Sequence, residues 1–408
     1  MNPLAIFGAS PIFDEPLHVG RPNIGNRQRF LERVNIIMDT KRLANDGPFV
    51  QEFERQIAMV LGVKHCVAAC NGTIALEIAA RAVGLHDEVI VPSFTFVATA
   101  HALQWQRIVP VFCDVDPQTH CIDPSQVEEK ITPRTSGIIG VHLWGRPCEI
   151  DALTEIARRH GLKLIFDASQ AFGSSYKGNM IGGFGEAEVL SFHATKFVSS
   201  GEGGAVVTNS DEIARELRLL KNFGFSNYDS VDSIGTNGKM SEISAAFGLS
   251  SLECLEEFIA ANLHNYKLYR EELRNSRGIQ VIAYDETEKS NFQYVVIEID
   301  EGVVPITRDQ FLDILWAENI LARRYFYPGI HHMEPYHSDP RYSQVVLRET
   351  DALSKRVLCL PTGTAVEEGA VKKVCSVIRY VIENADYIRT NWDKRKIHAY
   401  PGFASSES

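Results

Sequence analysis

Lys196 stands where a strand-like run and a glycine-rich turn meet. An apolar run at residues 189–192 precedes it, and the turn at 201–204 and a second apolar run at 205–207 follow it. Both runs have the length and composition of core strands. A charged lysine at the end of a core strand is poorly solvated, so its pKa falls and the neutral amine can form a Schiff base with an aldehyde. The alternative is an ordinary surface lysine in a loop.

Asp167 ends another strand-like run, residues 164–166, upstream of Lys196. In open α/β sheets, ligands bind outside the carboxyl ends of the strands. A carboxylate placed there can pair with a pyridinium nitrogen and keep it protonated, which makes the ring an electron sink. Asp167 could equally be the N-cap of a helix, because Ser-Gln-Ala-Phe closely follows it.

Two further features indicate binding rather than catalysis. Asn71, Gly72 and Thr73 come directly before an apolar helical pattern, and the free N–H groups at a helix start favour a phosphate. Phe94 and Phe96 follow the next strand-like run, where an aromatic ring can stack on a planar cofactor. Each feature has a plainer explanation, since Asn-Gly-Thr is also an ordinary capped turn and both phenylalanines could belong to the core.

Together these features match what pyridoxal 5′-phosphate requires of a protein. Gly72 and Thr73 offer an anchor for the phosphate, and Phe96 offers a stacking ring. Asp167 supplies the acid for the pyridine nitrogen, and Lys196 supplies the amine for the aldehyde. The four features support one another, so the sequence predicts a pyridoxal phosphate site.

Seven strand-like runs must position these residues. Helical patterns such as residues 150–160 separate several of them, which is typical of a mostly parallel sheet. We therefore expect an α/β fold whose large domain contains a mostly parallel seven-stranded sheet. The runs occupy residues 66–69, 88–91, 110–113, 137–141, 162–166, 188–192 and 204–208.

The second half of the chain changes character. Residues 239–274 are rich in helical pattern, and a strand at 292–299 is followed by helices at 307–319 and 365–384. This succession predicts a smaller α+β C-terminal domain. The expected division is a large cofactor-binding domain with the N-terminal segment at residues 1–262, a small domain at 263–400 and a disordered tail at 401–408.

Composition excludes several classes of protein. The chain has 408 residues, with 41 basic and 52 acidic residues and a net charge of −11, which disfavours a nucleic-acid partner. No apolar stretch approaches the roughly 20 residues of a membrane span, and the first residues do not resemble a signal peptide. The eight cysteines are scattered, and Cys66 and Cys70 lack partners at zinc-site spacing. We expect a cytoplasmic enzyme with no metal and no membrane partner.

The motifs occur in an order that resembles the pyridoxal-phosphate-dependent sugar aminotransferases of the DegT/DnrJ/StrS type. The resemblance spans nearly the whole chain and implies an aspartate-aminotransferase-like architecture, the type I fold of pyridoxal phosphate enzymes. Its motifs include RPNIGN (21–26), NDGPFVQEFE (45–54), CNGTIAL (70–76), PSFTFVATA (92–100), VFCDVDPQT (111–119), GVHLWGRPCEID (140–151), FDASQAFGSSYKG (166–178), SFHATK (191–196), GTNGKMSEISAAFGL (235–249), YFYPGIH (325–331) and LCLPTG (358–363).

The resemblance implies roles for the residues at the cofactor ring. Lys196 is expected to be the Schiff-base lysine, and Asp167 to pair with the pyridine nitrogen. Gln170 is expected near the ring oxygen, and Phe96 holds the position of the stacking aromatic. Related sugar dehydratases of this fold have histidine where Lys196 stands, so the lysine favours transamination over dehydration.

The resemblance also implies how the phosphate is held. Gly72, Thr73 and Ser191 are expected to bind it from the same subunit. Asn237 is expected to reach the phosphate in a neighbouring subunit, which implies a homodimer with shared active sites. The family often reads Asn-x-Arg at this motif, whereas this chain has Lys239 in place of the arginine. Lysine cannot reproduce the bidentate contacts of arginine, so this contact differs here.

The expected function follows from the site and the resemblance. It is transfer of an amino group from an amino acid, glutamate by family analogy, to a nucleotide-linked keto sugar. The segment at 235–246 looks most like family members that aminate C4 of dTDP-4-keto-6-deoxyhexoses. A 3-keto sugar aminotransferase, a lyase-type relative and a regulatory protein that binds the cofactor remain alternatives. His331 and His332 either line the sugar site or form an ordinary histidine pair in a loop.

Overall fold

The computed structural model describes residues 4–396, and seven strands in it form one central sheet. All neighbouring strands pair in parallel except β10, which runs antiparallel to both of its neighbours. The predicted α/β class and mostly parallel seven-stranded sheet are confirmed. In spatial order the strands are β2 (His65–Ala69), β10 (Gly204–Thr208), β9 (Ala187–Ser191), β6 (Lys163–Asp167), β5 (Thr135–Val141), β3 (Glu88–Pro92) and β4 (Val109–Cys113).

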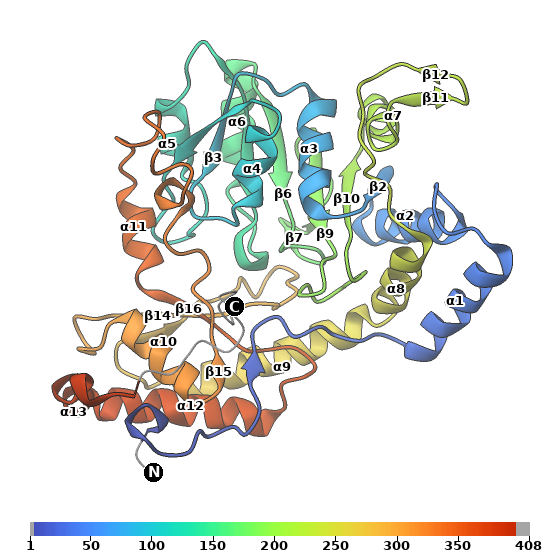
Figure 1. Cartoon of the computed structure of the whole chain (residues 1–408). Helices are drawn as coiled ribbons and strands as arrows, with labels where there is room; N and C mark the ends of the chain where they lie inside the picture. The colour runs from blue at the N-terminus through green and yellow to red at the C-terminus, as the bar shows by residue number, and fades with distance from the viewer. Residues whose placement is uncertain (1–3, 397–408) are drawn as a thin grey trace, which may run out of the picture.

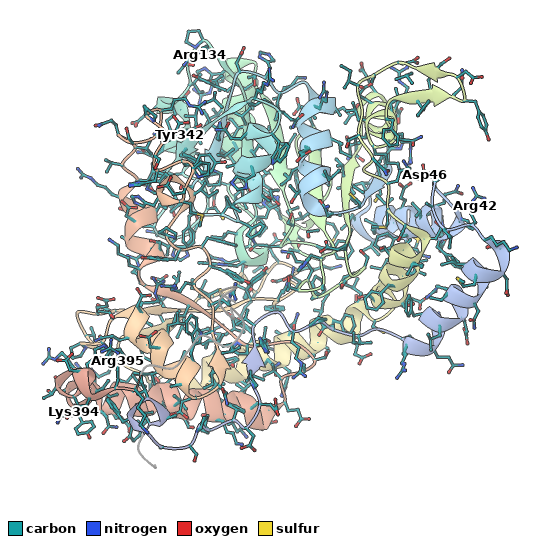
Figure 2. The ribbon with its side chains drawn as sticks, viewed as in Figure 1. Arg42, Asp46, Arg134, Tyr342, Lys394 and Arg395 are labelled. Carbon is teal, nitrogen blue, oxygen red and sulfur yellow. The ribbon has the colours of Figure 1, made fainter. Side chains whose placement is uncertain are left out.

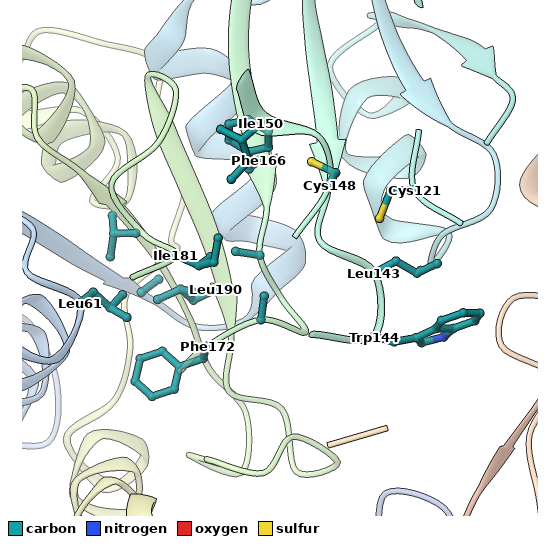
Figure 3. Packing of buried hydrophobic residues seen from close by; sticks show 14 of the residues in the cluster. Leu61, Cys121, Leu143, Trp144, Cys148, Ile150, Phe166, Phe172, Ile181 and Leu190 are labelled. Carbon is teal, nitrogen blue, oxygen red and sulfur yellow. The ribbon is translucent and has the colours of Figure 1, made fainter. Parts of the chain in front are cut away.

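Alternation of side chains along these strands produces two apolar faces. Val89 and Val91 belong to one buried cluster, whereas Ile90 between them belongs to another. Such alternation follows from the pleat, which sends successive side chains to opposite faces of a sheet. In the second cluster Phe166 lies close to Cys148, where Gly140 leaves room for its ring (Figure 3). Both faces are therefore covered, as a parallel sheet requires.

Helices cover the two faces in separate groups (Figure 1). Each group contributes the apolar side of its helices to the cluster beneath it. The first group consists of α3 (Gly72–Val83), α4 (Ala98–Gln104) and α7 (Asp211–Leu220). The second consists of α2 (Pro48–Leu61), α5 (Pro124–Glu129) and α6 (Ile150–His160).

A three-stranded antiparallel sheet and its helices form the smaller unit, drawn below the large sheet in Figure 1. The predicted α+β character of this region is confirmed, with shorter elements than expected. The stretch expected to be rich in helix, 239–274, contains two helices, and the first, α8 (Glu242–Leu252), packs its apolar residues into the cluster of the large sheet. The elements of the smaller unit are α9 (Leu255–Leu273), β13 (Ile279–Val281), β14 (Val295–Ile299), α10 (Arg308–Ala317), β16 (Val357–Leu360) and α12 (Glu368–Glu383).

The first residues of the described chain pack with this smaller unit. Leu4, Ala5 and Ile6 lie in its apolar cluster, and β1 (Leu17–His18) pairs in parallel with β15 (Ile320–Leu321). The domain prediction had placed this N-terminal segment with the large domain. The predicted boundary after residue 262 falls inside α9, and the predicted tail at 401–408 lies outside the described residues.

The remaining elements are short or peripheral. In the described part of the chain, no helix has the length and apolarity needed to cross a membrane. All eight cysteines fall in that part and none is in a disulfide. The elements are η1 (Ala5–Phe7), α1 (Arg27–Thr40), η2 (Leu143–Gly145), β7 (Ser175–Tyr176), β8 (Asn179–Met180), β11 (Phe225–Asn227), β12 (Ser230–Val231), η3 (Ile330–His332), α11 (Arg348–Ser354), α13 (Ala385–Thr390) and η4 (Trp392–Lys394).

Candidate active site

The carboxyl ends of four strands bring the predicted site residues to one edge of the sheet. β3, β6 and β9 run parallel, and β2 has the same direction because two antiparallel pairings relate it to β9. Ser191 ends β9 and Asp167 ends β6. Gly72 follows the end of β2, and Phe96 follows the end of β3. This edge is where open α/β sheets bind ligands.

The start of α3 forms a small cradle. The Asn71 side chain caps the helix by accepting a hydrogen bond from the N–H of Ile74 at 2.8 Å. A Cβ added to Gly72 would lie 3.1 Å from Cβ and 3.2 Å from Oγ of Ser191, so the helix start and the strand end approach closely. A Cβ on Gly204 would lie 2.5 Å from the Asn71 carbonyl carbon. The approach requires glycine at position 204, and glycine at position 72 leaves space beside Ser191 that a Cβ would narrow.

A buried network of charged residues contacts the loop that precedes the cradle. Lys221 is buried, and its Nζ lies 2.9 Å from Asp46 Oδ1 and 3.1 Å from Glu54 Oε1. Asp46 lies in the loop between α1 and α2 (Figure 2). The Lys221 carbonyl accepts a hydrogen bond from the N–H of Gly238, whose own carbonyl accepts one from the N–H of Cys70. This chain of contacts fixes the loop that begins the cradle.

Asp167 is buried and held by two donors. Its Oδ2 accepts a hydrogen bond from Thr99 Oγ1 at 2.8 Å, and its Oδ1 accepts one from the N–H of Ser169 at 3.1 Å. Residues 169–173 form turns rather than a helix, so Asp167 is not a helix N-cap. Thr99, from α4, is a residue that sequence reasoning missed, because its contact depends on the pairing of distant strands.

Lys196 lies in a turn beyond the end of β9, where its N–H donates to the carbonyl of His193 at 2.8 Å. Burial lowers the pKa of Lys196 to about 8, and the negative charge of Asp167 opposes part of that shift. The direction agrees with the sequence argument and argues against an ordinary surface lysine. The influence of Asp167 also indicates that the two residues share one site.

Gln170 is buried, and both its side chain and its backbone carbonyl accept hydrogen bonds. Its Oε1 accepts a hydrogen bond from the N–H of Trp144 at 2.8 Å, and its carbonyl accepts one from Asn291 Nδ2 at 2.8 Å. Trp144 follows β5, whereas Asn291 comes from the segment before β14. Neither partner carries a local sequence signal. These contacts hold Gln170 in the turn that follows Asp167, three residues further along the chain.

The two phenylalanines after β3 have different environments. Phe94 is buried and packs edge-on against Trp144, so it belongs to the core. Phe96 is 55% exposed, with its ring centroid 6.4 Å from that of Phe326. It lines a cavity of about 520 Å³ whose other walls are Thr95, Val97, Trp316, Arg323, Arg324, Tyr325, Phe326, Tyr327 and Met333. Phe96 is therefore available for stacking, whereas Phe94 is not.

Asn237 is exposed on the surface beside the cradle. Its backbone pairs with Asn222, and the next residue, Gly238, contacts the loop at Cys70. Lys239 Nζ lies 4.6 Å from the ring centroid of Phe223. The expected contact of Asn237 with a second subunit remains a prediction.

The histidine pair in the loop after Tyr325 does not line this cavity. His331 is 2% exposed, and its Nδ1 lies 2.7 Å from Ser93 Oγ. His331 and His332 instead meet Asp351 of α11. The sequence predicted no metal site, yet within the described residues these three side chains form a cluster with metal-ligand spacing.

Comparison with known proteins shows which class of enzyme has this fold. The sequence model of the DegT/DnrJ/EryC1/StrS aminotransferase family matches residues 25–379. A structure of DesI in the presence of its TDP-sugar product is 46% identical, with a TM-score of 0.92, and covers 96% of this chain and 99% of that one. The chain therefore belongs to the DegT/DnrJ/EryC1/StrS aminotransferase family.

Curated relatives carry related names. A dTDP-4-amino-4,6-dideoxy-D-glucose transaminase of Shigella dysenteriae is 39% identical over 368 residues, which is 90% of this chain and all of that protein. A GDP-perosamine synthase of Caulobacter vibrioides is 35% identical over 371 residues, covering 90% and 98%. The two names differ in their nucleotide, which is dTDP in the first and GDP in the second.

Proposed function

We propose that this enzyme uses pyridoxal 5′-phosphate to transfer an amino group from glutamate to a dTDP-4-keto-6-deoxyhexose. The observation that carries the proposal is Lys196, whose pKa is lowered to about 8 by burial, at the same sheet edge as the buried Asp167. Only a neutral amine attacks an aldehyde, and Asp167 can hold a proton on a ring nitrogen.

The residues present fit this cofactor. The cradle between Gly72 and Ser191 is narrow, and side chains at Gly72 and Gly204 would fill or distort it. N–H groups and a helix dipole at that point suit a phosphate. Phe96 is exposed for stacking, and Asp167 is oriented by Thr99. Gln170, Thr73 and Asn237 complete the proposed binding set by resemblance to the family.

Each residue then has a defined task in the reaction. The bound cofactor supplies an electron sink for a carbanion at the amino acid's α-carbon. Lys196 takes the proton from that α-carbon and later returns a proton to the carbon of the sugar that receives the amine. Asp167 keeps a proton on the ring nitrogen, and the donors Thr99 and Ser169 fix its orientation. Both substrates use the one site in turn, which predicts ping-pong kinetics.

The cavity beside Phe96 suits a nucleotide-linked sugar. Its aromatic walls can hold a base, and its arginines, Arg323 and Arg324, can attract a diphosphate. The names of the Shigella relative and of the DesI structure, both of which refer to thymidine-linked sugars, support thymidine and C4. Contacts between the protein and the nucleotide would orient the sugar for reaction, so a free keto sugar should react far more slowly.

We also propose a homodimer with shared sites. The hairpin of β11 and β12 projects from the body of the molecule (Figure 1), and Phe225, Tyr228 and Val231 on it are exposed. Exposed apolar side chains of this kind are typical of an interface. The hairpin precedes Asn237 in the chain, so a partner that covers it would also come near the exposed Asn237.

A panel of sugar nucleotides tests the proposed reaction. Glutamate-dependent amination is measured by mass spectrometry with dTDP- and UDP-linked 3-keto and 4-keto sugars, and with the free keto sugar. We expect the dTDP-4-keto-6-deoxyhexose to give the highest kcat/KM. Preference for a 3-keto isomer would overturn the assignment to C4 and leave transamination intact. No amination of any sugar by cofactor-loaded protein would favour a lyase or a regulatory protein.

A further inference from the structure

The strongest cluster that the proposed reaction does not use joins η3 to α11. Asp351 Oδ1 lies 2.8 Å from His332 Nε2 and 3.2 Å from His331 Nε2. The three potential ligand atoms all lie within 4.8 Å of one another. Ligands at about 2.0–2.2 Å from a tetrahedral zinc ion are themselves about 3.4 Å apart. The spacing of the three atoms therefore suits one small cation.

The contacts of the His331 ring also suit a bound cation. Ser93 Oγ accepts a hydrogen bond from the backbone N–H of His331 at 3.1 Å and lies 2.7 Å from its Nδ1. Nε2 of His331 is buried and lies 3.2 Å from Asp351 Oδ1, but it makes no well-aligned hydrogen bond. In the tautomer with its proton on Nδ1, the ring donates to Ser93 Oγ and presents the Nε2 lone pair to Asp351. A lone pair beside a carboxylate is unfavourable unless a cation lies between them.

The three side chains are also anchored independently of any metal. His331 is held by Ser93, just beyond the end of β3, in the way that metal-binding histidines donate their second N–H to a fixed acceptor. Asp351 lies in the first turn of α11. Asp114 fixes the start of this helix, because Asp114 Oδ1 accepts hydrogen bonds from the N–H and the Oγ1 of Thr350, each at 2.8 Å. Ser93 follows the end of β3 and Asp114 follows the end of β4, so two strands fix the positions of the proposed ligands.

We propose that His331, His332 and Asp351 bind a divalent transition-metal ion, with Zn²⁺ the best match, and that solvent completes its coordination. Two imidazoles and a carboxylate are ligands that zinc accepts, and His332 and Asp351 are partly open to solvent. The ion would tie the loop after Phe326 to α11.

Metal titration of the cofactor-loaded, tag-free enzyme tests this site. After removal of metal with a chelator, Zn²⁺ affinity is measured by competition with a chromophoric indicator, and Co²⁺ is titrated for its visible absorption bands. We expect one equivalent per chain and tetrahedral Co²⁺ bands. His332→Gln and Asp351→Asn should each abolish stoichiometric binding, and Ser93→Ala should weaken affinity about 10–100-fold.

His264→Gln is the matched control, because His264 is an exposed histidine on α9 that faces Glu368 at 3.7 Å. It should bind zinc like the wild type. Thermal unfolding should show equal stability of wild type and His332→Gln in chelator, with Zn²⁺ raising Tm only for the wild type. The proposal is wrong if the wild type binds no stoichiometric metal. It is equally wrong if binding survives in both ligand variants.

Discussion

At the scale of single residues, Asp167 and Lys196 show how burial prepares a group for chemistry. Asp167 is held by Thr99 and Ser169, so its carboxylate has one orientation. Lys196 is partly buried, and the poor solvation of its amine lowers the pKa, so the amine loses a proton more readily. Residue types and their places at strand ends made both predictable. Thr99, Trp144 and Asn291 could not be predicted, because their contacts join segments that lie far apart in the sequence.

Asp167→Asn should retain the fold and bind the cofactor but lose at least about 100-fold in transamination. The amide can still accept the hydrogen bond from Thr99, whereas it cannot hold a proton on the ring nitrogen. The measurement is kcat for glutamate-dependent amination alongside cofactor content. Asp386→Asn, at an exposed position in α13, is the matched control. Turnover near that of the wild type would remove Asp167 from its proposed role.

The lowered pKa of Lys196 predicts a pH dependence. Covalent capture of the cofactor's aldehyde by the apoenzyme should quicken about tenfold per pH unit below pH 8 and level off above it, because only the neutral amine reacts. The charge of Asp167 raises this pKa, so in Asp167→Asn the plateau should begin at lower pH. Stopped-flow absorbance measures both profiles. A wild-type rate that keeps rising to pH 10 would show an ordinary solvated lysine.

At the scale of elements, the strand ends and the start of α3 define the site. Short apolar runs predicted the seven strands because each is buried on both faces. The strand expected at 292–299 begins instead at Val295, since Phe292 has a positive φ of 48° and Asn291 is committed to contacts with Gln170 and Phe172. The helix expected at 307–319 begins at Arg308, because Thr307 forms a capping box with Gln310.

Gly72→Ala tests the cradle. Its new Cβ would lie 3.1 Å from Ser191 Cβ, so we expect cofactor affinity to fall about tenfold, or about 1.4 kcal/mol. Global stability should not fall, because alanine favours a helix. Fluorescence titration and thermal unfolding measure the two effects. Gly369→Ala in α12, where a Cβ meets nothing within 4 Å, is the control. Unchanged affinity in Gly72→Ala would exclude the phosphate from this cradle.

At the scale of the whole molecule, segments distant in sequence complete each unit. Leu17 at the N-terminus pairs beside Ile320, and Ile330 and Tyr336 from the second half pack into the cluster of the large sheet. Patterns along the chain predicted the large sheet and the smaller α+β region but not these contacts between the two halves, because hydrophobic periodicity indicates that a residue is buried and not which partner buries it. The family resemblance, rather than any local pattern, supplied the expectation of a shared dimer site at Asn237.

Complementation tests the shared site. Lys196→Ala and Asn237→Ala homodimers should each be nearly inactive, and mixing them under conditions that exchange subunits should restore roughly a quarter of wild-type activity. Half of the dimers are then hybrids, and each hybrid has one intact site of two. Activity after mixing is compared with that of either variant alone. Fully exchanged hybrids that stay inactive, or an active monomer in dilute solution, would contradict the proposal.

The most direct test of the whole account is chemical labelling of Lys196. The protein is loaded with pyridoxal phosphate, reduced with borohydride and digested, and the labelled peptide is identified by mass spectrometry. The account predicts one label per chain on Lys196, and loss of labelling when glutamate is added before reduction, because the amino donor displaces the lysine. A label on another lysine such as Lys221 or Lys239, or labelling that glutamate does not reduce, would contradict it.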